Sequence, residues 1–337
     1  MNTVLVTGGA GYIGSHAVQA LVQNGQNVVV YDNLSAGHAE AVHQAGGGKA
    51  VLVEGDILDT DRVRRAIEEH RADAIMHFAA SLSVAESVRS PAGYYRNNVG
   101  GALAVLDAMI ATGVKHFVFS STAAVFGNPE QTPITEEHPK RPINAYGETK
   151  LAIERALPHY DRAYGIRSVA LRYFNAAGAD PAGRLGEHHD PEPHVIPKAI
   201  DAAAGRGSFE VFGEDYETPD GTCLRDYVHV TDLASAHLLA LEALRRGASS
   251  TVYNLGNGRP TSVRAILASV ERVVGKPVPY TPGPRRAGDP AVLFASSDRI
   301  RRELGWAPKY EDVDTIVETA WRWRERNPHG YQAEARA

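Results

Sequence analysis

Apolar and polar positions alternate in blocks along the first half of the chain, and each block has the length of a strand or a helix. Residues 12–23 have the apolar spacing of an amphipathic helix. Short apolar runs predict strands at 3–6, 27–31, 50–53, 74–78, 117–120 and 168–171. Continuous apolar strands separated by helices are typical of a parallel sheet covered on both faces. The pattern therefore predicts a doubly wound α/β domain.

The second half has a different texture. Residues 175–194 are rich in Gly, Pro, Asp and His, which predicts a long loop. Thr231 precedes an amphipathic stretch that ends near Leu244, so it is the predicted N-cap of a long helix. Further elements are predicted at 195–205, 209–212, 261–274 and 311–325. We expect a dinucleotide-binding domain at 1–175, with a contribution from about 226–250, and a smaller, interleaved α/β lobe at 176–337.

Composition narrows the class of protein. The 337 residues are 43% hydrophobic and 22% charged, as in ordinary globular proteins of about two domains. The net charge of −5 gives no electrostatic reason to expect a nucleic-acid partner. The single cysteine, Cys223, cannot form an internal disulfide, which fits a reducing compartment. No apolar run reaches ~18 residues, so we expect no membrane association and a cytoplasmic location.

A glycine motif joins the first predicted strand to the first predicted helix. The spacing Gly8-x-x-Gly11-x-x-Gly14 permits a tight turn, close approach of backbone to a pyrophosphate, and packing of helix on strand. Asp32 ends the second strand, 18 residues after Gly14, where a carboxylate can accept hydrogen bonds from ribose hydroxyls. It would repel a 2′-phosphate, so NAD is favoured over NADP. The alternative is an aspartate in a surface turn.

Other residues fall where the cofactor is expected. Asp56 follows the third strand and can bond the adenine edge, and Ala79 and Ala80 follow Phe78 at the end of the fourth. Small residues there let backbone pass close to a ligand. Ligands of such sheets bind at the carboxyl ends of the strands. Each of these residues alone could be merely structural; their joint placement indicates a dinucleotide site.

Tyr146 and Lys150 carry the candidate chemistry. At a spacing of four on a helix, both side chains lie on one face. An ammonium near a phenol favours the phenolate, so we expect Lys150 to lower the pKa of Tyr146 below ~10 and make it a base. Thr122, at the end of the strand that contains Ser120, can hydrogen-bond a substrate alcohol beside Tyr146. The set predicts redox chemistry on an alcohol.

These motifs together resemble those of the extended short-chain dehydrogenase/reductase superfamily, and more narrowly of its UDP-glucose 4-epimerases. The narrower resemblance rests on segments in both halves of the chain and covers nearly its full length. These segments are Thr7–His16, Asp32–Leu34, Asn97–Asn98, Arg172–Asn175, Asp220–His229, Pro284–Asp289 and Trp321–Trp323.

The resemblance implies a Rossmann-type fold and a reaction. Tyr146 would take the proton of the sugar 4-hydroxyl while hydride leaves C4, and the 4-keto sugar would turn over before the hydride returns. Dehydratases and decarboxylases of the superfamily have a carboxylate two positions after the threonine, and dehydratases often one directly after it. Here Ala123 and Ala124 stand there, which favours an epimerase. The alternatives are a 4-epimerase of UDP-GlcNAc, a UDP-pentose or a UDP-uronate, a net dehydrogenase, or a redox-sensing binding protein without catalysis.

The resemblance also implies ligand contacts. Leu293 is near the position where tyrosine excludes an N-acetyl group and cysteine or serine admits one, so we expect weak or no activity on N-acetylated sugars. Implied NAD contacts, beyond those above, are Tyr12, Ile13, Asn33, Ile57, Asn98, Ser120, Lys150 and Tyr173. Implied UDP-sugar contacts are Thr122, Asn175, Val195, Phe212, Arg225, Tyr227, Arg286, Asp289 and Leu293. Family members pair through helices at about 92–112 and 147–163, which implies a homodimer.

Glu187-His188-His189-Asp190, with His194 nearby, could suggest a metal site. Metal sites need a more fixed ligand geometry than a polar loop of this spacing provides. Loop residues beside the substrate cleft explain the segment as well. The sequence therefore predicts no metal.

Overall fold

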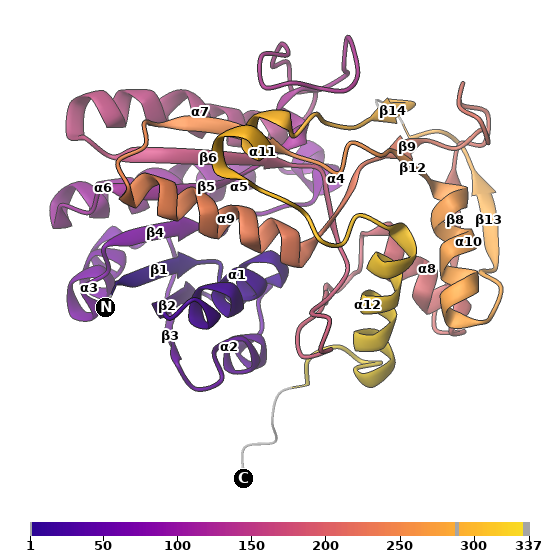
Figure 1. Cartoon of the computed structure of the whole chain (residues 1–337), viewed down its shortest axis with the longest axis horizontal. Helices are drawn as coiled ribbons and strands as arrows, with labels where there is room; N and C mark the ends of the chain where they lie inside the picture. Colours follow the sequence, from indigo (N-terminus) through magenta and orange to yellow (C-terminus); the bar gives the residue numbers. More distant parts are fainter. Residues whose placement is uncertain (1, 287–289, 333–337) are drawn as a thin grey trace.

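The computed structural model describes residues 2–286 and 290–332, and its centre is a seven-stranded parallel sheet (Figure 1). The strand order is β11-β6-β5-β4-β1-β2-β3, and every neighbouring pair is parallel. The strands are β1 (Thr3–Thr7), β2 (Asn27–Asp32), β3 (Ala50–Glu54), β4 (Ala74–His77), β5 (His116–Thr122), β6 (Arg167–Tyr173) and β11 (Thr251–Leu255).

Helices cover both faces of this sheet because its strands are apolar on both sides. Side chains alternate along β1: Val4 and Val6 belong to one buried cluster, and Leu5 belongs to another. The first cluster lies under α1 (Tyr12–Gln23), α2 (Ala39–Gly46), α9 (Val230–Arg245) and α11 (Asp298–Leu304). The second lies under α3 (Thr60–His70), α6 (Gly101–Thr112) and α7 (Ala145–Tyr164). The predicted Rossmann-type, doubly wound fold is confirmed.

Three local predictions need correction. The seventh strand, β11, was not predicted. Residues 175–194 are not wholly loop, since β7 (Asn175–Ala177) pairs in parallel with β10 (Tyr227–His229). Thr231 is not the N-cap: the N-cap of α9 is His229, two residues earlier, and its Nδ1 accepts the backbone N–H of Thr231 at 3.2 Å. The imidazole nitrogen of His229 accepts the helix N–H that a Ser or Thr hydroxyl more often accepts.

A smaller lobe lies beside the carboxyl end of the sheet and occupies the right of Figure 1. It contains α8 (Val195–Ala203), α10 (Val263–Val274), α12 (Val313–Arg326), a β8–β13 pair (Phe209–Phe212 with Tyr280–Gly283) and a small sheet of β12 (Thr261–Ser262), β9 (Leu224–Arg225) and β14 (Val292–Leu293). Its apolar side chains form a third core. The predicted domain boundaries stay a prediction.

Four short helical segments complete the first half. They are α4 (Val84–Arg89), α5 (Pro91–Tyr94), the π-helical turn η1 (Tyr95–Gly100), which runs into α6, and the 3₁₀ turn η2 (Ala123–Val125) after β5. Among residues 2–286 and 290–332, no helix combines the length and the apolar character that a bilayer crossing requires.

The strand order predicts a ligand-binding crevice over β1 and β4. These two strands are neighbours, yet the chain moves from β1 to β2 on one side and arrives at β4 from the far edge at β3. Loops at the carboxyl ends of such a pair diverge, and ligands of open α/β sheets bind between them. Gly8 and Ala79 follow these two strands and mark the crevice.

Candidate active site

The glycine turn after β1 is built around two contacts that leave no room for a side chain. Gly8 has φ +73°, and a Cβ on it would lie 2.4 Å from Ala79 N. A Cβ on Gly14 would lie 2.1 Å from Gly8 O. A Cβ on Gly11 would meet nothing closer than 3.4 Å, so this glycine borders open space.

Gly11 is also the N-cap of α1. Because it has no side chain, the N-cap itself does not cover the N–H groups of the first turn, which includes Tyr12 and Ile13. These donors and the positive end of the helix dipole suit a pyrophosphate. The Tyr12 side chain points elsewhere, since its hydroxyl donates to Gly178 O at 2.6 Å and so ties α1 to the smaller lobe.

Asp32 is held in place by the turns that follow β1 and β2. Its carboxylate accepts N–H bonds from Ala10 at 3.0 Å and from Leu34 at 2.9 Å, and it is 8% exposed. Burial raises the pKa of Asp32, while the two backbone bonds lower it. Asn33 Nδ2 lies 3.3 Å from Asp56 Oδ2, so the polar groups that follow β2 and β3 adjoin. This set fits the adenosine end of a dinucleotide.

Two residues predicted to contact the cofactor, Ile57 and Asn98, also make contacts within the protein. Ile57 is buried in the second core, and its side chain would lie 2.3 Å from a Cβ on Gly101. The amide of Asn98 accepts from Ser81 N at 2.8 Å and donates to Ser81 O and to Thr149 Oγ1, each at 3.1 Å. Asn98 therefore fixes the loop after β4 against the helix of Tyr146.

Phe78, Ala79 and Ala80 leave β4 at the crevice as predicted. The N–H groups of Phe78 and Ala79 both bond Thr7 O, at 2.8 and 3.1 Å. The Phe78 ring packs on His237 of α9 with 4.7 Å between centroids. The backbone thus passes directly beside the glycine turn.

A group of hydroxyl, phenol and ammonium side chains meets where β5, β6 and α7 converge. This Tyr–Lys cluster consists of Ser120, Thr122, Tyr146, Lys150 and Tyr173. Asn144 starts α7 as its N-cap, accepting Gly147 N at 2.8 Å, and this places Tyr146 in the first turn. Lys150 is 3% exposed and its Nζ donates to Ser120 O at 2.8 Å. The Ser120 hydroxyl is hydrogen-bonded to the Tyr173 phenol.

The electrostatics of the cluster differ from expectation. In the protein alone, burial raises the pKa of Tyr146, and a hydrogen bond with Thr122 lowers it only in part. Burial also lowers the pKa of Lys150 to about 7. The predicted lowering of the tyrosine pKa by Lys150 is thus not found, because desolvation dominates and the ammonium is directed at the Ser120 carbonyl.

A buried ion pair behind the cluster was missed from sequence. Arg172 and Glu154 are 2% and 4% exposed and form a two-point contact, with Nε–Oε1 2.9 Å and Nη2–Oε2 2.5 Å. Ser121 Oγ also donates to Glu154 at 2.5 Å. Glu154 lies one helical turn after Lys150 and favours the charged form of that lysine. The spacing of four residues between Lys150 and Glu154 was the only feature in the sequence that could have pointed to Glu154.

The smaller lobe brings several of the predicted substrate residues together. The Arg286 guanidinium lies over the Phe212 ring, 4.0 Å from its centroid, so a predicted phosphate contact and a predicted base contact adjoin. Arg225 on β9 is in register with Leu293 on β14. Leu293 packs on the cluster of Val125 and Phe126, which follows Thr122 by a few residues.

Of the remaining predicted substrate residues, those that the structure describes lie in different elements. Asn175 Nδ2 donates to Asp226 O at 2.9 Å, which joins the start of β7 to the residue before β10. Val195 begins α8, and Tyr227 is 7% exposed in the third core. Asp289 lies outside the described residues.

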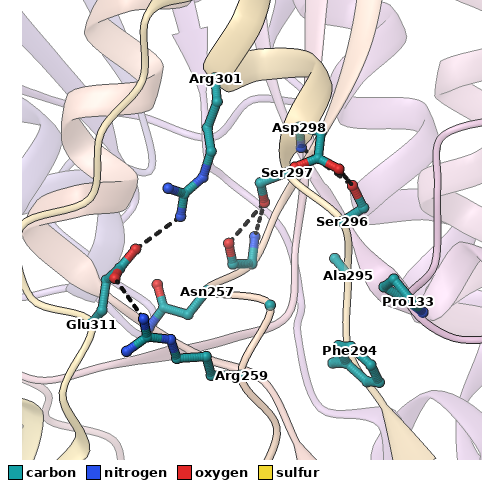
Figure 2. A pocket seen from close by; sticks show the side chains of 12 residues that line it. Pro133, Asn257, Arg259, Phe294, Ala295, Ser296, Ser297, Asp298, Arg301 and Glu311 are labelled. Carbon is teal, nitrogen blue, oxygen red and sulfur yellow. Dashed lines mark hydrogen bonds and ion pairs between the residues drawn. The ribbon is translucent and has the colours of Figure 1, made fainter.

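A separate hollow of about 360 Å³ lies between the loop 256–259 and residues 294–298 (Figure 2). Figure 2 shows the two arginines of this hollow, Arg259 and Arg301, turned towards Glu311, with N–O distances of 3.9 and 2.9 Å. None of the Tyr–Lys cluster lines it. We therefore do not assign the predicted chemistry to this hollow.

Comparison with known proteins agrees with this geometry. Residues 4–256 match the NAD dependent epimerase/dehydratase family. The chain is 50% identical to a UDP-glucose 4-epimerase of Halalkalibacterium halodurans over 98% of both chains. The chain belongs to the UDP-glucose 4-epimerase family.

Solved structures of UDP-glucose 4-epimerases have the same fold as this family member. The enzyme of Brucella ovis in complex with NAD is 52% identical, with a TM-score of 0.92 over 95% of this chain and 98% of that one. The enzyme of Bifidobacterium longum in complex with NAD⁺ and UDP is 37% identical, with a TM-score of 0.92 over 98% and 100% of the two chains.

Proposed function

We propose that this protein interconverts UDP-glucose and UDP-galactose by inverting C4 of the hexose, with NAD as its resident cofactor. The observation that carries the proposal is the Tyr–Lys cluster at the carboxyl ends of β5 and β6, on the same sheet edge as the glycine turn. The relatives identical at 50% or more over nearly their whole length carry the name UDP-glucose 4-epimerase.

The chain has the groups that NAD requires. A Cβ at Gly8 or Gly14 would collide with backbone atoms, whereas a Cβ at Gly11 would enter the space proposed for the pyrophosphate, which the first N–H groups of α1 border without a capping side chain. Asp32 and Asn33 would bond the adenosine ribose, and Asp56 would face the adenine. When bound, NAD supplies the oxidised nicotinamide that accepts a hydride from the sugar and later returns it.

Tyr146 would be the base and then the acid of the reaction. As phenolate it takes the proton of the 4-hydroxyl while the C4 hydrogen leaves with its electron pair, which converts the alcohol into a 4-keto sugar. The same phenol returns its proton when hydride is delivered to the other face of C4. No net oxidation results, since each electron pair removed from the sugar is given back to it.

Thr122 and Lys150 would assist Tyr146. A hydrogen bond from Thr122 already stabilises the phenolate and lowers the pKa of Tyr146 against the effect of burial. Lys150 is held by Ser120 O within the cluster and contributes a positive charge when protonated. Asn98 would act by position, because its amide fixes Thr149, and Thr149 Oγ1 donates to Tyr146 O at 2.7 Å.

The smaller lobe would hold the nucleotide. The stacked pair of Arg286 and Phe212 suits a diphosphate next to a uracil ring, since guanidinium binds phosphate through parallel N–H bonds. Arg225 would add a second cation, and Leu293 would border the hexose. Asn175, Val195, Tyr227 and Asp289 complete the proposed substrate contacts.

Two features favour epimerisation over related reactions. Thr122 Oγ1 accepts Ala124 N at 3.2 Å, so the positions after the threonine form a turn of two alanines with no acid or base to act at C5 or C6. The Tyr146 and Lys150 pair is present, which a binding protein without catalysis would not need. A 4-epimerase of another UDP-sugar and a net dehydrogenase are the remaining alternatives.

We further propose that the protein acts in the cytoplasm as a homodimer. The single cysteine is buried and the chain contains no helix, among its described residues, that could cross a membrane. The helices near 92–112 and 147–163 would form the pairing surface.

The test is a product assay. Purified protein is incubated with UDP-galactose, with and without added NAD, and UDP-glucose is quantified by chromatography. We expect interconversion without accumulation of NADH, and a fall of ~10³-fold in Tyr146→Phe with the fold unchanged. Steady accumulation of NADH would identify a dehydrogenase. Turnover of UDP-pentoses or UDP-uronates, with none of the two UDP-hexoses, would identify another epimerase.

A further inference from the structure

Four side chains of the segment between β7 and α8 converge on one point. They are Glu187, His189, Glu192 and His194, and one ligating atom from each lies within 4.8 Å of all the others. The segment carries them in the order Glu-x-His-x-x-Glu-x-His. Distance in the sequence is short, but the chain must fold back on itself to bring all four heads together.

The distances within this His–Glu cluster fit the coordination shell of a metal ion. His189 Nδ1 lies 3.3 Å from Glu187 Oε1 and 3.5 Å from Glu192 Oε2, and His194 Nδ1 lies 3.2 Å from Glu192 Oε1. Ligand atoms at ~2.0–2.1 Å from a tetrahedral Zn²⁺ stand roughly 3.3 Å apart. The fourth histidine–glutamate contact, between His194 Nδ1 and Glu187 Oε1, is closer at 2.6 Å and would have to open slightly.

The direction of these polar atoms is a second, independent observation. Glu187 Oε1, His189 Nδ1 and Glu192 Oε2 are buried, and within the described part of the chain none of them has a hydrogen-bond partner of acceptable geometry. The Glu187 and Glu192 side chains are 7% and 9% exposed. His194 Nδ1 and Glu192 Oε1 are hydrogen-bonded to each other. The other three histidine–glutamate approaches have no such geometry, as expected when lone pairs point at a shared centre rather than at one another.

The neighbourhood does not supply the missing partners. Arg324 donates to Asp201 through Nε at 3.0 Å and Nη2 at 2.5 Å, and its Nη1 makes no hydrogen bond to any described residue, the two glutamates included, although its charge acts on both of them. The Tyr12 ring lies edge-on to His189 at 6.5 Å between centroids, and its hydroxyl is used by Gly178. Two glutamates carry two negative charges, which one divalent ion neutralises if both imidazoles are neutral.

We propose that Glu187, His189, Glu192 and His194 bind one divalent transition-metal ion of borderline softness, of which Zn²⁺ is the type. Two imidazole nitrogens and two carboxylate oxygens suit Zn²⁺, whereas Mg²⁺ and Ca²⁺ prefer oxygen ligands alone. Four protein ligands leave no open position, which is the property of a structural site. The ion would brace the segment that leads into α8 against α1, through the contact of His189 with Tyr12.

Second contacts already orient the ligands. Glu192 Oε1 accepts the backbone N–H of His194 at 3.0 Å, which keeps the last two ligands together. Partners of this kind are common around bound metal ions and strengthen binding. This proposal revises the prediction from sequence that the chain has no metal site.

The test uses the full-length protein, freed of metal with a chelator and then titrated with Zn²⁺ by calorimetry. We expect one Zn²⁺ per chain, a higher melting temperature in its presence, and no comparable binding of Mg²⁺ or Ca²⁺. His189→Ala and Glu192→Gln should each weaken binding at least ~100-fold. His188→Ala is the matched control, because His188 lies next to the cluster in sequence but stacks on His38 at 4.6 Å; it should change the affinity less than ~3-fold.

A second measurement does not depend on how the variants fold. X-ray absorption of the Zn²⁺-loaded wild type should give four N/O ligands, two of them imidazole. The proposal is overturned if no stoichiometric Zn²⁺ binds, which would leave two histidine–glutamate ion pairs. It is equally overturned if His188→Ala loses as much affinity as His189→Ala, or if absorption indicates fewer than two imidazoles.

Discussion

Lys150 Nζ donates a hydrogen bond to the carbonyl oxygen of Ser120 at 2.8 Å, and this bond holds the helix of Tyr146 against the end of strand β5. Lys150 is 3% exposed; burial lowers its pKa, and the charge of Glu154 favours its protonated form. The protein therefore accepts a cost in stability to keep a cation in the cluster, as is common at sites that carry chemistry.

Lys150→Met tests this cost. Burial lowers the pKa of Lys150 from 10.5 to about 7, so between these pH values the unfolded chain holds a proton that the folded protein has released. Wild-type stability should therefore rise with pH over this range. We expect Lys150→Met to be more stable than wild type by roughly 2–4 kcal/mol at pH 6, with the difference shrinking towards pH 10.

The measurement is urea unfolding of the NAD-free proteins at several pH values, together with the epimerase assay. Turnover of Lys150→Met should be at least ~100-fold slower. If Lys150→Met is less stable than wild type at pH 6, burial of Lys150 does not lower the free energy of unfolding.

Thr122→Val should move the pH dependence of turnover. The hydrogen bond from Thr122 lowers the pKa of Tyr146, so its loss should raise that pKa further and reduce the phenolate fraction at neutral pH. We expect the rising limb of the kcat–pH profile to shift to higher pH and Thr122→Ser to restore it. An unshifted profile with a lower plateau would mean that Thr122 only places the substrate.

Gly11 and Gly14 should respond differently to alanine. The Cβ of Gly14→Ala would lie 2.1 Å from Gly8 O, a backbone atom, so we expect a loss of at least ~2 kcal/mol of unfolding free energy. In Gly11→Ala the nearest atom is 3.4 Å away, and we expect a loss of at most ~1 kcal/mol.

The distinction lies in NAD affinity. A methyl group at Gly11 would enter the space proposed for the pyrophosphate, so Gly11→Ala should weaken NAD binding at least ~10-fold despite its near-normal stability. Urea unfolding without NAD and a fluorescence titration with NAD measure the two effects separately. Normal NAD affinity in Gly11→Ala would place the pyrophosphate elsewhere.

Leu293 should influence the range of sugars. It is partly buried and packs on the cluster that contains Val125 and Phe126, a few residues after Thr122, where the hexose is proposed to lie. Leu293→Ser removes most of that bulk, and we expect kcat/KM for UDP-N-acetylglucosamine to rise relative to that for UDP-glucose by ~10-fold, since added space is worth ~1–3 kcal/mol in such pockets.

The ratio of the two kcat/KM values is the decisive quantity, because it cancels any general loss of activity. Leu293→Met, of similar volume, is the control and should leave the ratio within ~2-fold. A ratio that is unchanged in Leu293→Ser would place the N-acetyl discrimination on another residue.

Local pattern predicted much of the fold. The alternating apolar strands and helices of the first half gave the doubly wound sheet, and residues 12–23 and 209–212 match α1 and β8. β11 was missed because its five residues become a strand through pairing with β6, which lies about 80 positions earlier in the chain. The N-cap of α9 was misplaced because a histidine ring, a rare cap, replaces the expected hydroxyl.

The candidate site also contains features that the sequence predicts and features that only the tertiary structure shows. The sequence by itself determined the glycine turn, the acidic residue after β2 and the Tyr146–Lys150 spacing, because each depends on residues close together in the chain. Only the tertiary structure decided how burial shifts the pKa of each ionisable group. Desolvation depends on every element packed around a group, so the packing set the pKa values of Tyr146 and Lys150. The packing of α7 on β6 paired Arg172 with Glu154, and the path of one loop gathered Glu187, His189, Glu192 and His194 around one point.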